Sequence, residues 1–288
     1  MGKTNPIIKF FGYTLGRFMS DKAYLKFRYK KIFGKKLNLK NPQTFNEKLQ
    51  WLKLYDRKPI YTTMVDKYAV KKYVADIIGD EYIIPTLGVW DKFDDIDFDK
   101  LPNQFVLKCT HDSGGLVIIK DKSTFDKVKA KKTIEKALKT KFYLAGRERP
   151  YKNVPRKIIA EQYMEDSETQ ELRDYKVLCF NGEPKLIQIH DGRYTNHTKD
   201  TDDCDWNRLD MVHGSPMSDK IIEKPSFLEN MLKLTKILAK DLAHVRIDWY
   251  FVNNKLYFGE ITFYVASGFT KFQPQKWDYE LGSWIKIK

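Results

Sequence analysis

The chain has 288 residues, of which 42% are hydrophobic and 31% are charged, so we expect a globular protein of two or three lobes and not a disordered one. No apolar run approaches the roughly 20 residues that a membrane span needs. The formal net charge of +14 indicates an anionic partner, but the basic residues are dispersed and not gathered in one recognition helix, so we expect no nucleic acid.

The N-terminal residues, 1 to about 40, are strongly basic and aromatic. As an amphipathic helix, residues 1–35 could make a peripheral contact with an anionic membrane. The alternative is an ordinary helix that packs on the body of the protein and leaves its basic face in solvent.

Two further helices are predicted before residue 80. Thr44-Phe-Asn-Glu47 is a capping-box pattern, which marks the start of a helix. Residues 66–78 form an amphipathic pattern that ends at a glycine, with Lys67 in the first turn of the predicted helix.

A glycine-rich loop, His111-Asp-Ser-Gly-Gly115, lies between two predicted antiparallel strands, residues 104–110 and 116–120. Backbone N–H groups of such a loop can bind a phosphate. It is not a Walker A loop, because no Gly-Lys-Ser/Thr opens a helix, and a plain hairpin loop is the alternative. Lys108 ends a nearly apolar strand, where a partly desolvated ammonium group requires a negative partner.

The middle of the chain predicts a lysine-rich helix and then three strands, at residues 123–142, 157–164, 172–180 and 184–190. The period of two places Asp174, Lys176 and Leu178 on one face of their strand. Residues 191–218 are polar, match no metal-ligand spacing and predict an irregular loop. Ser226-Phe-Leu-Glu229 is a second capping-box pattern before another helix.

The stretch from residue 244 to 263 has two runs rich in β-branched and aromatic residues on either side of Asn253-Asn254-Lys255, which predicts a hairpin. A two-residue Asn-Asn loop would place Asp248 and Glu260 on opposite faces, whereas a three-residue loop would pair them on one face. The three-residue loop also places Gly259 opposite Trp249 among apolar side chains. On the other face it collects the charged and polar residues Arg246, Asp248, Glu260 and Thr262, and this separation favours it.

Two carboxylates side by side on rigid strands repel each other unless a cation lies between them. Mg²⁺ usually takes one or two carboxylates and completes its shell with water and substrate phosphates, so Asp248 and Glu260 form a candidate magnesium site. The alternative is a half-buried hairpin with a solvated polar face, in which Asp248 pairs with a lysine.

The three cysteines, Cys109, Cys179 and Cys204, form no CxxC pair, which is typical of a reducing cytoplasm and not of a disulfide framework or zinc site. The N-terminus has no continuous apolar stretch followed by a small-residue cleavage site, so we expect no signal peptide. A cytoplasmic protein is predicted, with the inner face of the membrane as a more specific location.

The order of these features resembles the ATP-grasp ligases, and several phrases are most similar to the teichuronopeptide (TupA-like) branch. The matching phrases run from about residue 36 to the end of the chain: Thr44-Phe-Asn-Glu-Lys-Leu-Gln-Trp51, Phe105-Val-Leu-Lys-Cys109, Tyr175-Lys176, Val245-Arg-Ile-Asp248 and Tyr257-Phe-Gly-Glu-Ile-Thr-Phe263. The resemblance implies an α+β ATP-grasp fold, in which two antiparallel-sheet lobes clasp ATP. The expected parts are a basic helical N-terminal segment (1–60), an N-terminal lobe with a lid loop (61–160) and a C-terminal lobe with the magnesium site (161–288).

The resemblance also implies which residues would bind ATP. Lys67 and Lys108 would hold its phosphates, and Lys176 would approach them from the second lobe. The lid over the phosphates would contain His111, Ser113, Gly114 and Gly115. The adenine would lie in a slot lined by Glu161, Gln162 and Met164.

The same resemblance implies that Mg²⁺ is ligated by Asp248, Glu260 and Thr262. The candidate catalytic residues are Arg246, Lys108 and Lys176, with Arg246 neutralising the transferred phosphoryl group. Thr262 departs from the family pattern, which usually has Asn at this position. The arginine that usually follows is missing from residues 263–268, which leaves more of the neutralisation to Arg246.

The implied function is an ATP- and Mg²⁺-dependent carboxylate–amine ligase of bacterial surface polysaccharide biosynthesis, for capsule or cell wall. Its partners would be an acidic sugar or polysaccharide precursor, activated at a uronic-acid carboxylate, and an amino acid. One rival is a glycosyltransferase of the same pathway, for which Asp203-Cys204-Asp205 supplies an Asp-x-Asp sequence. The other is a non-catalytic module that binds anionic glycan or membrane.

Overall fold

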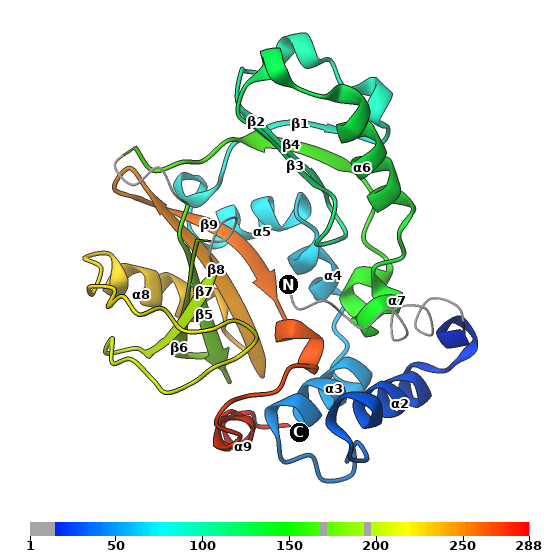
Figure 1. The fold of residues 1–288 in the computed structure, drawn as a ribbon, viewed down its shortest axis with the longest axis vertical. Helices are drawn as coiled ribbons and strands as arrows, with labels where there is room; N and C mark the ends of the chain where they lie inside the picture. The colour runs from blue at the N-terminus through cyan, green and yellow to red at the C-terminus, as the bar shows by residue number, and fades with distance from the viewer. Residues whose placement is uncertain (1–14, 168–171, 193–196, 288) are drawn as a thin grey trace.

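The strands of this protein form two separate sheets, each covered by helices. The computed structural model describes residues 15–167, 172–192 and 197–287. Within these residues one sheet has four strands and the other five, and all neighbouring strands are antiparallel. Figure 1 shows β1–β4 with α6 in an upper lobe and β5–β9 with α8 in a second lobe. The predicted α+β architecture of two antiparallel-sheet lobes is confirmed.

The N-terminal part is helical. Its helices are η1 (Leu15–Phe18), α2 (Asp21–Phe33), α3 (Phe45–Tyr55), α4 (Ile60–Val65) and α5 (Ala69–Ile78). The capping box predicted at Thr44 is confirmed, because its side chain accepts from Glu47 N at 3.2 Å and the Glu47 carboxylate accepts from Thr44 N at 3.2 Å. Figure 1 shows α3 between α2 and the C-terminal helix α9 (Lys276–Trp284).

The basic helix α2 packs on the body of the protein. Its residues Tyr24, Leu25 and Tyr29 are buried in a small core with Leu37 and Phe269. Residues 1–14, which carry part of the predicted membrane contact, lie outside the described residues. In the described part of the chain, no helix combines the length and apolar character needed to cross a membrane.

The first sheet has the strand order β1-β4-β2-β3. Its strands are β1 (Thr86–Trp90), β2 (Phe105–Cys109), β3 (Leu116–Ile119) and β4 (Ile158–Gln162), and the helices α6 (Lys127–Lys139) and α7 (Tyr143–Gly146) lie between β3 and β4 in sequence. One face packs Phe105, Leu107 and Ile158 in a core with Ile134 of α6. Strand alternation therefore turns Lys108 to the face away from α6.

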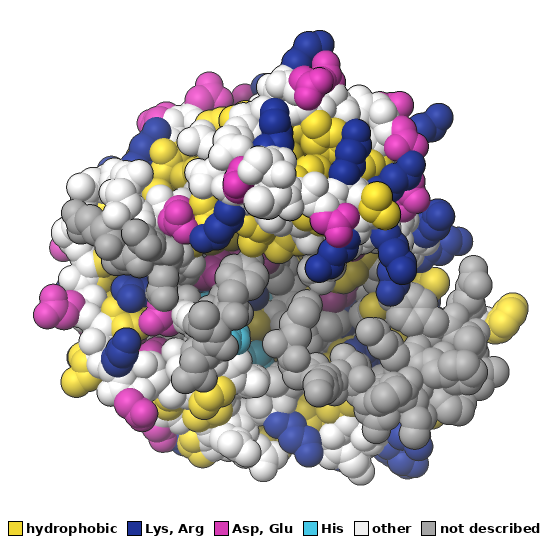
Figure 2. All heavy atoms as spheres, turned by 45° about the horizontal axis from the view of Figure 1, so that its top comes forward, with side chains coloured by type: hydrophobic (Ala, Val, Ile, Leu, Met, Phe, Trp, Pro, Cys, Tyr) yellow, Lys and Arg dark blue, Asp and Glu magenta, His cyan; other side chains and the backbone are white. Residues whose placement is uncertain are grey.

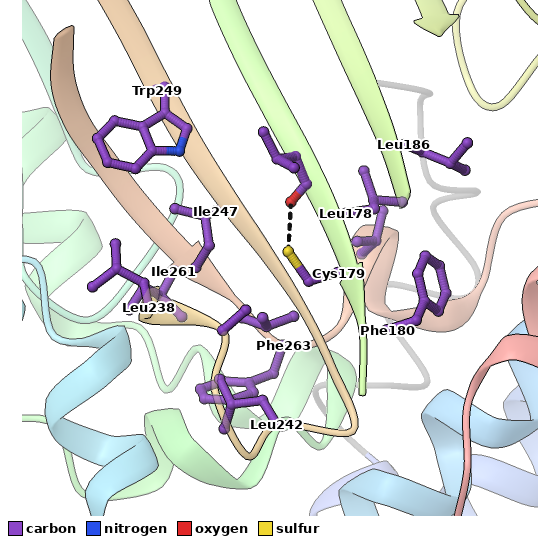
Figure 3. Close-up of a cluster of buried hydrophobic side chains, with 14 of the residues drawn as sticks. Leu178, Cys179, Phe180, Leu186, Leu238, Leu242, Ile247, Trp249, Ile261 and Phe263 are labelled. Atoms are coloured by element: carbon purple, nitrogen blue, oxygen red, sulfur yellow. Dashed lines mark hydrogen bonds between the residues drawn. The ribbon is translucent and has the colours of Figure 1, made fainter. Parts of the chain in front are cut away.

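The second sheet has the order β7-β6-β5-β8-β9. Its strands are β5 (Asp174–Phe180), β6 (Glu183–Asp191), β7 (Thr198–Asp203), β8 (His244–Val252) and β9 (Lys255–Thr262). Figure 3 shows Ile247, Trp249 and Ile261 on one side of the sheet with Leu238 of α8 (Leu228–Leu238). Burial of this face leaves the other face for polar side chains.

Two predictions about this lobe were wrong. Residues 191–218 include the edge strand β7 and are not irregular throughout. Ser226 does not cap α8: the helix begins at Leu228, and its N-cap residue, Phe227, makes no side-chain cap hydrogen bond.

Candidate functional site

The β8–β9 hairpin closes through a tighter turn than we predicted. Asn253 and Asn254 form a two-residue turn, with φ values of 50° and 63°, and Val252 pairs with Lys255. Positive φ at both central residues is what a type I′ hairpin turn requires, and Asn tolerates it. The predicted three-residue loop is therefore wrong.

A β-bulge at Gly259 nevertheless pairs the two carboxylates. Trp249 pairs with Phe258, and the next pair is Asp248 with Glu260, so Gly259 is an extra residue in β9. The predicted position of Gly259 opposite Trp249 is wrong. A Cβ atom on Gly259 would lie 3.1 Å from Asp248 O and 3.0 Å from the Tyr250 ring, so the bulge favours glycine.

Arg246 joins the candidate metal residues on the polar face. Its Nε donates to Asp248 Oδ1 at 2.6 Å, and its Nη2 lies 2.7 Å from both Asp248 Oδ2 and Glu260 Oε1. The same Nη2 is 3.1 Å from Thr262 Oγ1, which in turn donates to Glu260 at 2.9 Å. Lys176 of β5 donates to Asp248 and, at 3.2 Å, to Asp174. All five residues predicted for this half of the site are therefore brought together.

The charges in this cluster stabilise one another. Asp248 is 1% exposed, and burial alone would raise its pKa. The neighbouring Arg246 and Lys176 outweigh burial and hold that pKa below its ordinary value. For Arg246, burial lowers the pKa, but Asp248 and Glu260 raise it above its ordinary value. Asp248 therefore stays ionised although it is buried.

The donor set fits a cation of the magnesium type. Two carboxylates and the Thr262 hydroxyl converge on one cationic nitrogen, Nη2 of Arg246. Across the described ranges, no group of three or more His, Cys, Asp or Glu could hold a metal. A magnesium ion here would thus have two carboxylates, one hydroxyl and oxygen atoms from phosphate and water, as is usual for this ion.

A second charged cluster lies on the first sheet. Glu161 of β4 is 5% exposed and forms ion pairs with Lys108 of β2 and, at 2.6 Å, with Lys71 of α5. Burial alone would raise the pKa of Glu161, but Lys108 and Lys71 outweigh it and lower the pKa to about 2. Lys71 was not predicted as a site residue. Nothing in the sequence distinguishes Lys71 from its exposed neighbour Lys72 on the same helix.

The predicted lid loop is held from both sides. Lys67 lies just before α5, not within it, and its Nζ donates to the carbonyl of Asp112. The Asp112 carboxylate accepts from Gly115 N at 3.0 Å, and buried His111 contacts Thr140 O at 3.1 Å through Nε2. The two central loop residues, Ser113 and Gly114, are exposed. The loop thus presents Ser113 and Gly114 to solvent, while His111 and Gly115 pack inward.

The three residues predicted for the adenine slot follow one another at the end of β4. Glu161 is engaged by the two lysines, whereas Gln162 is exposed and its backbone N–H donates to Pro85 O at 3.0 Å. Met164 is partly exposed just beyond the strand. Gln162 and Met164 are therefore accessible, and Glu161 orients Lys108 in this structure.

A family model described as TupA-like ATPgrasp matches residues 47–286. No curated protein matches the chain. Among solved structures, the match to the D-alanine–D-alanine ligase from Bacillus anthracis complexed with ATP has 17% identity and a TM-score of 0.41, and it covers 70% of this chain and 54% of that one. The match to the D-alanine–D-alanine ligase from Helicobacter pylori has 15% identity and a TM-score of 0.46, and it covers 84% of this chain and 69% of that one. The match to the L-amino acid ligase from Bacillus licheniformis has 10% identity and a TM-score of 0.45, and it covers 87% of this chain and 55% of that one. The chain thus spans little more than half the length of the first of these ligases.

Proposed function

The chain belongs to the TupA-like ATP-grasp family, and on this premise we propose that it is an ATP-dependent carboxylate–amine ligase. The observation that carries the proposal is the convergence of Asp248, Glu260 and Thr262 on a single cationic nitrogen of Arg246. Rigid paired strands hold this arrangement, and it suits the cation that accompanies a nucleotide triphosphate.

The reaction proceeds in two steps. A carboxylate oxygen attacks the terminal phosphorus of ATP, which gives an acyl phosphate and releases ADP. An amine then attacks the acyl carbon, the amide bond forms, phosphate leaves, and the amine loses a proton. The first step needs positioning and charge neutralisation more than covalent help from the protein.

The charged side chains of the two lobes divide this task. Lys67, just before α5, and Lys108 of the first sheet would hold the phosphates, with Glu161 and Lys71 fixing the position of Lys108. Lys176 and Arg246 of the second lobe would neutralise the transferred phosphoryl group.

Mg²⁺ would be held by Asp248, Glu260 and Thr262. Bound there, it would neutralise charge on the phosphate oxygens. Arg246 would release part of its contact with the two carboxylates and turn its guanidinium group to the phosphoryl oxygens.

Loop 111–115 would protect the acyl phosphate. Water hydrolyses such an intermediate, so the loop over the phosphates must exclude it during the second step. The contact between Lys67 and the Asp112 carbonyl ties the loop to a phosphate-binding residue, which supports a loop position that changes when ATP binds.

The proposed carboxylate belongs to a uronic acid of a bacterial surface polysaccharide or its precursor, and the proposed amine is that of an amino acid. The family assignment and the net charge of +14 support this choice. In Figure 2, Lys and Arg side chains are spread over the face shown and interspersed with Asp and Glu. Such a dispersed positive charge suits long-range attraction of an acidic glycan. We place the reaction in the cytoplasm, at the inner face of the membrane.

The glycosyltransferase alternative is less compatible with the structure. Its Asp-x-Asp sequence begins at Asp203, whose carboxylate accepts from Asp205 N at 2.9 Å and from Asn207 N at 2.8 Å. These bonds close a turn after β7, so Asp203 has a local structural role.

A coupled assay that measures ADP release, with uronates and amino acids offered singly and in pairs, tests the proposal. We expect ADP release to require both partners and to fall by about 100-fold or more in Lys108→Ala and Glu260→Gln. Lys131→Ala removes a surface ion pair with Asp94 and serves as the control that keeps the wild-type rate. Sugar transfer from a nucleotide sugar without use of ATP would contradict the proposal.

A further inference from the structure

The polar face of the second sheet continues past the candidate metal residues to the β7 edge. Strand pairing places five residues in one row, each directly opposite the next: Glu260, Asp248, Lys176, Gln188 and Thr201. Side chains directly opposite each other in antiparallel strands share a face. Gln188 and Thr201 therefore extend the face of the candidate site over β6 and β7.

The two residues at this end of the row have unused hydrogen-bonding capacity. Gln188 is 1% exposed and Thr201 is 0% exposed. Within the described residues, the amide nitrogen and oxygen of Gln188 and the hydroxyl of Thr201 have no hydrogen-bond partner. Buried polar atoms are nearly always paired, so three unpaired atoms on adjacent side chains indicate a partner outside the chain, either a ligand or ordered water.

A lysine and a histidine lie next to this pair. Lys199 is two residues before Thr201, so its side chain leaves the same face of β7, and its Nζ is 2.9 Å from His213 Nδ1 and from His213 O. Burial lowers the pKa of Lys199 to about 7, and the charges of Arg246 and Lys176 act in the same direction. Lys199 is therefore close enough to Arg246 and Lys176 for their charges to lower its pKa.

The composition of this end of the face selects one class of substrate. It carries an amide, a hydroxyl and an amine, whereas the acidic residues Asp200 and Asp202 of β7 alternate to the opposite face. Amide and hydroxyl groups pair with substrate hydroxyls. The carboxylate beside them on this face, Asp174 of β5, already accepts from Lys176 at 3.2 Å, so hydroxyl groups suit this end of the face better than a substrate ammonium group.

We propose that Gln188 and Thr201 bind the hydroxyl groups of a sugar acid, with its carboxylate directed along the row towards Lys176 and Asp248. Gln188 lies two strand spacings, about 10 Å, from Asp248, so the substrate's hydroxyls and its reacting carboxylate occupy different parts of one face. The direction of the carboxylate rests on the proposed ligase function. The hydroxyl-binding role rests on the unpaired atoms themselves.

The test uses Gln188→Leu and Thr201→Val, which remove the polar atoms with little change of shape. The control is Thr198→Val, on the same strand but with its side chain on the opposite face. The measurements are the dissociation constants of D-glucuronate and D-galacturonate, obtained by calorimetry with a non-hydrolysable ATP analogue and Mg²⁺ present, and the free energy of unfolding.

We expect each row variant to weaken uronate binding by about tenfold and to leave nucleotide binding unchanged. We also expect each to be at least as stable as the wild type, because an unpaired buried polar group is removed. Unchanged uronate affinity, or no uronate binding by the wild type, overturns the proposal. Lower stability with unchanged uronate affinity also overturns it, since the polar atoms would then bind structural water.

Two further outcomes distinguish failure of the proposed hydroxyl-binding subsite, Gln188 and Thr201, from failure of the ligase proposal. If the wild type binds a uronate through this row and releases no ADP with any amine, the ligase proposal fails and the subsite stands. If ADP release occurs and the KM for the uronate is the same in the row variants, the subsite fails and the ligase stands.

Discussion

Asp248 and Glu260 lie directly opposite each other on β8 and β9 because Gly259 is an extra residue between them and the turn. The two-residue turn alone would place the carboxylates on opposite faces of the hairpin. The bulge restores their pairing and still leaves Trp249, Phe258 and Ile261 buried on the other face. The geometry of the candidate metal site therefore depends on one glycine.

Substitution of this glycine should damage the site more than the fold. In Gly259→Ala, the added Cβ lies 3.1 Å from the Asp248 carbonyl oxygen, so the backbone must shift by a few tenths of an ångström. We expect a loss of about 1 kcal/mol in the free energy of unfolding and about tenfold weaker Mg-ATP binding. Gly259→Val should lower both the free energy of unfolding and the affinity for Mg-ATP further than Gly259→Ala does. Wild-type nucleotide affinity in Gly259→Ala would show that the pairing tolerates a side chain.

Lys71 should matter for ATP although it was not predicted as a site residue. In Lys71→Met, Glu161 loses one of its two cations and holds Lys108 more tightly, which keeps Lys108 from the phosphates. We expect the KM for ATP to rise severalfold, by about 1 kcal/mol of binding free energy. Lys72→Met is the matched control, because Lys72 is on the same helix in an exposed pair with Asp76. Equal KM values for the two variants would contradict this role.

Glu161 should make the protein sensitive to acid. Its pKa is about 2 in the folded protein, below the ordinary value of 4.5. The stability that it contributes is therefore complete above about pH 4.5 and is lost as the pH falls towards 2, on the order of 3 kcal/mol in total. Urea unfolding between pH 2 and 6 should show a shallower pH dependence in Glu161→Gln. Identical slopes would contradict the ion-pair cluster.

Lys199 should likewise make the stability rise with pH, but in the alkaline range. Its folded pKa of about 7 lies below the ordinary lysine value of 10.5, so the unfolded chain binds the proton more tightly between these values. The free energy of unfolding should therefore rise with pH above 7, by at most about 1.4 kcal/mol per pH unit. In Lys199→Met this contribution disappears, and the remaining rise comes from groups such as buried Lys53. Unfolding curves of both proteins between pH 6.5 and 9 give the difference.

Much of the fold and the site composition followed from the sequence, because the hairpins have clear apolar alternation and the charged residues follow recognisable phrases. The turn did not, since Asn253-Asn254-Lys255 is compatible with two loop lengths. The bulge that compensates for it has only a weak signal, an isolated glycine within a strand.

The edge strand β7 was missed for a different reason. Both of its faces are polar: Lys199 and Thr201 point to the candidate site, while Asp200 on the other face binds Arg208. Such a strand shows no alternation of apolar and polar residues, which is the usual signal. Its place in the sheet depends on pairing with β6, which no local pattern reveals.

The central claim is that a substrate carboxylate is activated as an acyl phosphate, and isotope transfer tests it most directly. A uronate labelled with ¹⁸O in its carboxylate is turned over with ATP and an amino acid, and the released phosphate is examined by mass spectrometry. We predict that each phosphate carries one ¹⁸O atom from the carboxylate, because the oxygen that attacks ATP leaves with the phosphate. Phosphate without the label, released together with ADP and amide, would contradict the account.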